Sequence, residues 1–438
     1  MAGILLDQAL YAPGTPGGTL CGCCRGFAFP QGLRTYVHEL DHNKMPPMLS
    51  TRVSQIQPSP TVGLASIVRE LRERGEDVVS FGAGEPDFDT PEPIREAGVR
   101  AIRDGHTHYT PGPGLPELRE AIAKKLHREN GVHAEVQGIV VSCGAKQAVF
   151  NALMALCDPG DEVILLAPYW MTYKDQVVLA GGVPTVVHTR PEDGFVPDMD
   201  QVRAAITSKT KVVILNSPAN PTGSVFPRSV LKEVAALALR HNLYVISDEI
   251  YEKHVYDGAG HVSIASLGRE IADRTVTVGG FSKSHAMTGW RLGYSVSNRE
   301  IATSISKIQD QVTSNACSIS QYAALAAFEN SESDVHAMVQ EFAERRNLLL
   351  GAISEIPGVR CQRPLGAFYL FPDVSQSIHG KLESDIALAE YLLREHKVAC
   401  VPGSVFEGPG HIRLTYALSS EQMLEGARRI ANGLGALS

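Results

Sequence analysis

The chain has 438 residues, of which 40 are lysine or arginine and 48 are aspartate or glutamate, so its formal net charge is −8. Hydrophobic residues make up 44% of it, enough for a large domain with a smaller one beside it. The acidic balance excludes an obvious nucleic-acid-binding surface, and no apolar run reaches the roughly 18 residues of a membrane span. We therefore expect a soluble protein with no nucleic-acid or membrane partner.

Residues 1–47 are rich in glycine and proline and have no sustained hydrophobic period, which predicts a disordered or loosely packed extension. Its CGCC segment at 21–24 lacks the histidines or second cysteine pair of a zinc site, so we expect no metal. The other five cysteines are solitary and mostly in apolar contexts, which predicts buried, reduced thiols. The expected location is the cytoplasm, or a plastid if the extension is a transit peptide; a mis-assigned start near residue 48 is the alternative.

From residue 59 onwards, apolar strands alternate with helices, which predicts an α/β fold with a mostly parallel sheet between helices. Strands are expected at 77–81, 139–142, 162–167, 212–216, 243–247 and 276–278, and helices at 61–74, 115–129 and 229–241, with another ending at 156. Long helices are expected over 299–329 and 333–355, followed by strands at 366–370 and 411–416 around a helix at 384–396. The smaller α+β domain would combine residues 48–85 with 321–438, and the large domain would span 86–320.

Loops after three of these strands carry candidate ligand-binding residues. Gly84 lies in a glycine-rich turn that permits close backbone approach to a ligand. Gly144, Ala145 and Lys146 join a strand to a helix N-terminus, where free amides and the helix dipole bind anions such as phosphate. Trp170 follows a strand and could stack on a flat ring. Tight turns and a structural tryptophan are the simpler alternatives.

Two further strands end in polar residues. Asn220 belongs to the loop Asn216–Gly223, whose proline and asparagine content also fits an ordinary turn. Asp248 ends its strand, where a carboxylate could bind a ring nitrogen or simply cap a helix, and Tyr251 follows three residues later.

The segment 280–294, GFSKSHAMTGWRLGY, places Lys283 and Arg291 eight residues apart. Lys283 follows an apolar strand and is therefore expected at the ligand-binding edge of the sheet. A desolvated lysine near other cations loses its proton and can form a Schiff base with a carbonyl cofactor such as pyridoxal phosphate, whose phosphate Arg291 could bind through paired donors. Taken alone, a surface lysine and a loop arginine would explain the spacing equally well.

This segment resembles the lysine-attachment motif of class I, fold-type-I aminotransferases, and the resemblance extends from about residue 49 to the C-terminus. It is closest to the bacterial and plastid aspartate/prephenate branch. The resemblance implies a homodimeric pyridoxal phosphate enzyme with Lys283 as the catalytic residue and Tyr109 reaching the neighbouring subunit's cofactor phosphate. The cofactor-binding residues it implies are Tyr109, Gly144, Ala145, Lys146, Trp170, Asn220, Asp248, Tyr251, Ser282 and Arg291. The substrate-binding residues it implies are Thr61, Gly84, Lys146, Trp170, Asn220 and Arg413.

Substrate choice rests on residues that the shared chemistry does not require. Arg413 lies among apolar residues of a short strand, where a buried arginine is costly unless it meets an anion, and the resemblance gives it the α-carboxylate. Thr61 and Lys146 match positions that bind a distal carboxylate, although Thr61 could merely cap its helix and Lys146 could serve the phosphate. The expected reaction is transamination of aspartate or glutamate with 2-oxoglutarate or oxaloacetate, extending to prephenate and arogenate. An aminotransferase for alanine or aromatic substrates and a carbon–sulfur lyase of the same fold remain alternatives.

Overall fold

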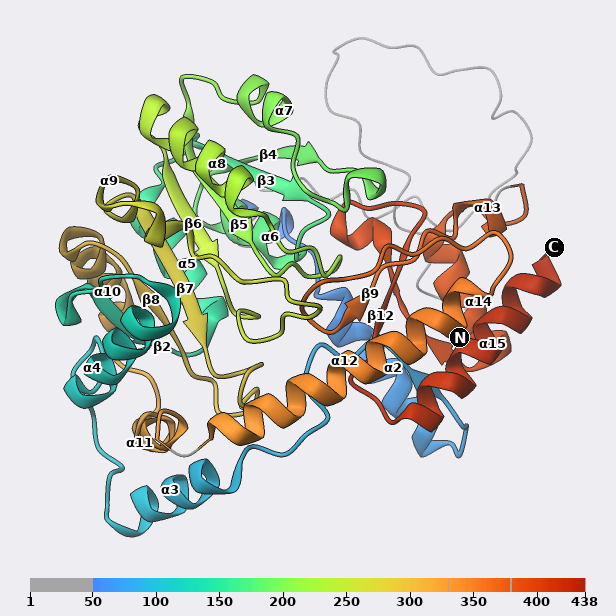
Figure 1. Cartoon of the computed structure of the whole chain (residues 1–438), viewed down its shortest axis with the longest axis horizontal. Helices are drawn as coiled ribbons and strands as arrows, with labels where there is room; N and C mark the ends of the chain where they lie inside the picture. Colours follow the sequence, from blue (N-terminus) through green and yellow to red (C-terminus); the bar gives the residue numbers. More distant parts are fainter. Residues whose placement is uncertain (1–49, 330, 379, 438) are drawn as a thin grey trace, which may run out of the picture. The chain divides into compact units, whose positions relative to one another are not determined.

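The computed structural model describes residues 50–329, 331–378 and 380–437, and its largest sheet has seven strands (Figure 1). The predicted extension 1–47 and its CGCC segment lie outside these residues. The strand order is β2-β8-β7-β6-β5-β3-β4; β8 runs antiparallel to both neighbours, and the other pairs are parallel. The strands are β2 (Ile139–Ser142), β3 (Glu162–Ala167), β4 (Val183–His188), β5 (Thr210–Asn216), β6 (Tyr244–Asp248), β7 (Thr275–Gly280) and β8 (Gly293–Val296).

Helices cover both faces of this sheet, so its strands are apolar on both sides. Val163 and Leu165 of β3 pack in one cluster, whereas Ile164 and Leu166 pack in another on the opposite face, as the two-residue period of a strand requires. The first face carries α5 (Ala145–Leu156), α6 (Thr172–Leu179) and α10 (Arg299–Val312). The second carries α3 (Glu92–Arg103), α4 (Pro116–Lys125), α7 (Met199–Ala204), α8 (Arg228–His241), α9 (Arg269–Ala272) and α11 (Ser318–Ala327).

The N-terminal end of the described chain packs with its C-terminal part. Strand β1 (Val79–Ser80) pairs in parallel with β10 (Val398–Ala399), and a second small sheet has the order β11-β12-β9. These last strands are β11 (Val401–Pro402), β12 (Ile412–Thr415) and β9 (Tyr369–Leu370). Accompanying helices are α1 (Thr51–Ser54), α2 (Pro60–Glu73), α12 (Glu332–Ser354), α13 (Ser375–Ile378), α14 (Asp385–His396) and α15 (Ser420–Leu437). Short helical turns lie at Leu126–Asn130, Val136–Gly138, Pro191–Asp193, Ile264–Leu267 and Gly403–Phe406.

The predicted helix over 299–329 is wrong as a single element. It is interrupted after Val312 by a turn in which Ser314 has a φ of +61°, and α11 starts at Ser318. Turn-forming residues at 313–315 compete with the helix by bonding locally to the backbone. One result is that Cys317 is exposed, contrary to the buried thiol expected; Cys400 is buried, and the other three described cysteines are partly buried.

The topology gathers polar residues at one edge of the central sheet. Strands β2, β3, β5, β6 and β7 all end at this edge, and the antiparallel β8 begins there. In open α/β sheets, ligands bind in the crevice beyond the carboxyl ends of the strands. Among the described residues, no helix is long and apolar enough to cross a membrane.

Candidate active site

A cavity of about 360 Å³ opens at this carboxyl edge of the sheet. Most of the residues predicted for the site line it: Thr61, Gly84, Ala145, Lys146, Trp170, Asn220, Asp248, Tyr251, Ser282, Lys283, Arg291 and Arg413. Gly144 lies just behind the guanidinium of Arg291. Tyr109 does not line the cavity of its own chain, and its side chain is 89% exposed. The structure therefore brings together residues from the whole length of the described chain.

Lys283 lies partly buried in the loop that follows β7, and its ammonium donates to the carbonyl of Gly84. Burial lowers the pKa of Lys283 to about 8, helped by the positive charges of Arg413 and Arg291 and opposed by the carboxylates of Glu85 and Asp248. A lysine with this pKa has an appreciable fraction of free amine near neutral pH, which is the nucleophilic form.

Asp248 is 2% exposed at the end of β6 and accepts two hydrogen bonds. Its Oδ2 accepts from the Tyr173 hydroxyl at 2.6 Å, and its Oδ1 accepts from the Ile250 amide at 3.1 Å. Burial raises the pKa of Asp248 to about 6, although both donors stabilise the charged form. A carboxylate has about four acceptor positions, so Asp248 retains capacity for a ring N–H facing the cavity.

The turn between β2 and α5 and the guanidinium of Arg291 form an anion cradle. Gly144 has a φ of +88°, and a Cβ there would lie 2.5 Å from Nη2 of Arg291. Only glycine therefore lets the guanidinium lie against this turn. No side chain caps the start of α5, which leaves its first amides free for a phosphate oxygen. Ser282 adds a hydroxyl from the lysine loop.

Arg413 is buried on β12 with an unused donor. Its Nη1 donates to Asn220 Oδ1 and its Nη2 to the Gly82 carbonyl, both at 3.0 Å, whereas its Nε has no partner among the described residues. Its guanidinium lies over the ring of Tyr369, with Cζ 4.4 Å from the ring centroid. Arg413 also lines the cavity, and a guanidinium in such a position is suited to bind a carboxylate.

Lys146, Trp170 and Thr61 all line the cavity. The Lys146 ammonium is 4.9 Å from the centroid of the Trp170 ring. Surrounding protein lowers the pKa of Lys146, and the positive charge of Arg291 adds to this effect. The Thr61 hydroxyl lies 3.1 Å from that of Ser59, and no side chain caps α2, so Thr61 has no capping role.

Several functional side chains were not predicted from the sequence. Tyr173 follows Trp170 by three residues, so the spacing of one helical turn could have placed it near the same strand end. Glu85 is adjacent to Gly84 and accepts from the Thr288 hydroxyl at 2.7 Å. Tyr369 contacts both Arg413 and Tyr251, but its position depends on a distant strand pairing that no local pattern encodes.

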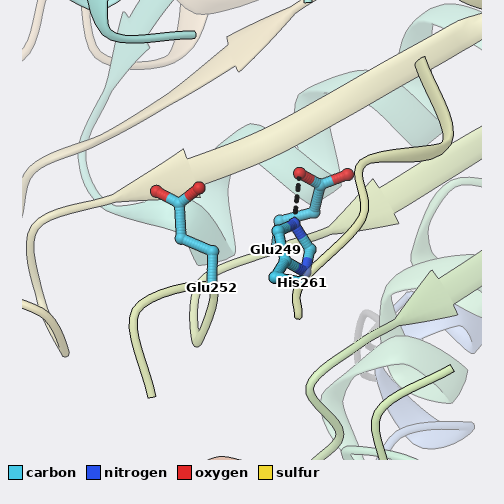
Figure 2. Close-up of side chains that lie close together, drawn as sticks. All are labelled: Glu249, Glu252 and His261. Carbon is cyan, nitrogen blue, oxygen red and sulfur yellow. Dashed lines mark hydrogen bonds and ion pairs between the residues drawn. The ribbon is translucent and has the colours of Figure 1, made fainter. Parts of the chain in front are cut away.

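One group among the described residues has the composition of a metal site: Glu249, Glu252 and His261, whose ligand atoms lie within 4.8 Å of one another (Figure 2). Protein donors already serve these carboxylates. The His261 Nε2 lies 3.0 Å from Glu249, Ser263 donates to Glu249 at 2.8 Å, and Lys125 pairs with Glu252. Burial alone would raise the pKa of Glu252, but the charges of Lys125 and His261 lower this pKa to about 2. Glu249, Glu252 and His261 therefore form a network of hydrogen bonds and ion pairs with Ser263 and Lys125.

The donors and acceptors of the cavity fit pyridoxal phosphate. Lys283, with its lowered pKa, is suited to react with the aldehyde of this cofactor. The cradle formed by Gly144 and Arg291 is suited to bind its phosphate, and the buried carboxylate of Asp248 is suited to bind its pyridine nitrogen. Trp170 lies beside the same space. The sheet and this cavity together define a pyridoxal-phosphate-binding enzyme of the fold-type-I class.

Comparisons with known proteins specify the family. Residues 76–430 match "Aminotransferase class I and II". The chain is 47% identical over 388 residues to the probable aspartate/prephenate aminotransferase of Aquifex aeolicus (strain VF5), covering 88% of this chain and 98% of the relative. It is 44% identical over 413 residues to the bifunctional aspartate aminotransferase and glutamate/aspartate-prephenate aminotransferase of Petunia hybrida, covering 92% and 86%. The solved structure of aspartate aminotransferase from Thermus thermophilus with maleate is similar at a TM-score of 0.84 and 44% identity, covering 89% of this chain and all of that one.

The chain belongs to the class I and II aminotransferases, whose cofactor is pyridoxal phosphate. The predicted fold class, enzyme family and cofactor are confirmed.

Proposed function

We propose that this aminotransferase transfers the amino group between aspartate or glutamate and 2-oxoglutarate or oxaloacetate, and also converts prephenate to arogenate. We further propose that it acts as a cytoplasmic homodimer. The names of the relatives support the substrate class: those in Aquifex aeolicus and Petunia hybrida are both named for aspartate and prephenate. Besides the amino or oxo group that reacts, all of these substrates have a second carboxylate.

The observation that carries the proposal is the presence of two cationic side chains, Arg413 and Lys146, in one cavity with Lys283. Arg413 lines the cavity and would bind the α-carboxylate through its guanidinium. Lys146 then meets the distal carboxylate, with the Thr61 hydroxyl beside it. A dicarboxylic substrate needs a second cation in the pocket, opposite its desolvated distal carboxylate. A monocarboxylic substrate needs no such second cation.

In this proposal the remaining residues of the site have the following roles. Bound pyridoxal phosphate supplies an aldehyde that condenses with amines and a ring that accepts electrons from the substrate carbon. Lys283 would hold the cofactor and, as a free amine, would act as the base for the proton on the substrate α-carbon. Asp248 would bind the ring nitrogen and favour its protonated form, Trp170 would lie against the ring, and Asn220 and Tyr251 would bond its phenolic oxygen. The turn Gly144–Lys146, Ser282 and Arg291 would hold the phosphate, and the Gly84 loop would place a backbone amide near the substrate carboxylate.

The test is a panel of amino donors and oxo acids, prephenate included, run on wild type, Lys146→Ala and Lys174→Ala. Lys174 is the matched control because it lies on α6 outside the cavity lining and pairs with Glu407. With dicarboxylates, we expect kcat/KM of Lys146→Ala to fall by an amount equivalent to about 1.5 to 3 kcal/mol of transition-state stabilisation, which is the contribution of one charged hydrogen bond. Turnover of alanine or phenylalanine should fall less, and Lys174→Ala should behave as wild type.

An equal loss on every substrate would assign Lys146 to the cofactor and remove the support for acidic substrates. Wild-type preference for alanine or phenylalanine would contradict the proposal outright.

A further inference from the structure

Tyr369 connects two groups of the active site without lining the cavity itself. It lies on β9, fully buried, where it is paired with Thr415 of β12. Its hydroxyl oxygen is 2.9 Å from that of Tyr251, and its ring lies under the guanidinium of Arg413. The same side chain therefore contacts the tyrosine proposed to bond the cofactor oxygen and the arginine proposed to bind the substrate carboxylate.

The two hydroxyl groups share one hydrogen bond, whose direction matters for the cofactor. Burial raises the pKa of both Tyr251 and Tyr369, so each phenol keeps its single proton, and the geometry allows either hydroxyl to be the donor. If Tyr251 donated to Tyr369, it would have no proton left for a ligand in the cavity. If Tyr369 donates instead, the Tyr251 proton is free to point into the cavity, and accepting a bond makes Tyr251 a stronger donor.

We propose that Tyr369 is a positioning residue whose hydroxyl donates to Tyr251 and thereby directs the Tyr251 proton toward the ring oxygen of the bound cofactor. The inference rests on the proposed role of Tyr251, but it requires only that the cofactor binds at Lys283 and not that any particular substrate is used. Tyr369→Phe is the appropriate variant, because it removes the hydroxyl and leaves the ring against Arg413.

The experiment is a pH titration of the absorbance of the lysine-bound cofactor in the holoenzyme. Weaker donation from Tyr251 leaves the cofactor's ring oxygen more basic, so the lysine-linked chromophore keeps its proton to higher pH. Loss of one neutral hydrogen bond should raise the spectroscopic pKa of Tyr369→Phe by about 0.5 to 1 unit. The dissociation constant of maleate, an unreactive dicarboxylate, should stay within about twofold of wild type, since the ring still supports Arg413.

Two comparisons separate this role from a loss of stability. Tyr416 belongs to the same core, and its hydroxyl donates to the Ala367 carbonyl at 3.0 Å without contacting Tyr251. Tyr416→Phe should lower the melting temperature and leave the spectroscopic pKa unchanged. On a Tyr251→Phe background, Tyr369→Phe should add no further shift, because its effect passes through the Tyr251 hydroxyl.

A wild-type titration in Tyr369→Phe would overturn the inference, as would equal shifts in Tyr369→Phe and Tyr416→Phe. If Tyr251→Phe also titrated as wild type, the proposed role of Tyr251 would fail as well. A wild-type enzyme that binds cofactor but ignores aspartate would refute the proposed function and leave this inference intact.

Discussion

At the scale of single residues, His254 is the clearest case of a buried polar group without a use in the site. Both ring nitrogens lack a hydrogen-bond partner among the described residues. The centroid of the ring is 5.5 Å from that of Phe368 and 5.6 Å from that of Phe342. Burial lowers the pKa of His254 to about 3, and the charges of Lys283 and His285 act in the same direction. An unpaired buried polar group costs the desolvation energy of that group.

We therefore predict that His254→Leu raises the free energy of unfolding by about 1 to 2 kcal/mol, measured by urea denaturation. The pH dependence has a definite sign. Between pH 6.5 and about 3 the unfolded chain protonates this histidine and the folded chain does not, so wild type loses stability as the pH falls through that window. The variant should lose less. His241→Leu on the exposed face of α8 is the control, and a marked destabilisation by His254→Leu would show that the imidazole has partners.

The residues that could be predicted for the site are those that follow strand ends. Asp248 ends an apolar strand, and Lys283 and Asn220 lie in the loops that follow two others, so parallel strands deliver all three to one edge. Tyr173 has only the weak signal of its spacing from Trp170. Tyr369 has no such signal, because a tyrosine in an apolar segment has the composition of an ordinary core residue, and its contacts with Arg413 and Tyr251 depend on packing between segments far apart in the sequence.

At the scale of elements, the turn between β2 and α5 can bind the cofactor phosphate only if Gly144 keeps its positive φ. We predict that Gly144→Ala weakens pyridoxal phosphate binding to the apoenzyme by about tenfold or more, since a disfavoured backbone conformation costs about 1 to 3 kcal/mol. The added Cβ would also displace the guanidinium of Arg291. Titration of apoenzyme with cofactor measures the effect.

Gly351→Ala is the control for this prediction. Gly351 lies in α12 with no atom within 4 Å of an added Cβ, so alanine there should raise stability and leave cofactor affinity unchanged. Equal cofactor affinity in Gly144→Ala and wild type would show that the turn does not bind the phosphate.

Elements with a strong apolar period were predictable, and their ends less so. The expected strands 139–142 and 162–167 coincide with β2 and β3, because β-branched and aliphatic runs bounded by turn residues form buried strands. The expected strand 77–81 contracts to Val79–Ser80, since its pairing partner β10 is only two residues long. The helix break at 313–317 was missed because helical spacing of apolar residues resumes beyond it.

At the scale of the whole molecule, the exposure of Tyr109 has a consequence for assembly. A tyrosine that is 89% exposed on its own chain contributes to the site only if a second copy receives it. The homodimer and the division into domains at 86 and 320 stay predictions. In the proposed dimer, each site combines Lys283 of one protomer with Tyr109 of its partner.

Mixing two defective variants tests this arrangement. Lys283→Ala alone should be inactive, and Tyr109→Ala alone should bind cofactor weakly. After the two are unfolded and refolded together, random pairing should restore about a quarter of wild-type sites, because half of the dimers are hybrids with one intact site each. Activity no higher than the sum of the separate variants would contradict a site shared between protomers.

The most direct measurement of the central claim is a half-reaction of the wild-type holoenzyme with aspartate in the absence of any oxo acid. An acidic-substrate aminotransferase should release one equivalent of oxaloacetate per lysine-bound cofactor and then stop, with the cofactor absorbance converted to that of the amine form. Added 2-oxoglutarate should restore the original absorbance and release glutamate. Continuous release of ammonia, or no change of absorbance with aspartate while alanine or phenylalanine produces one, would contradict the account.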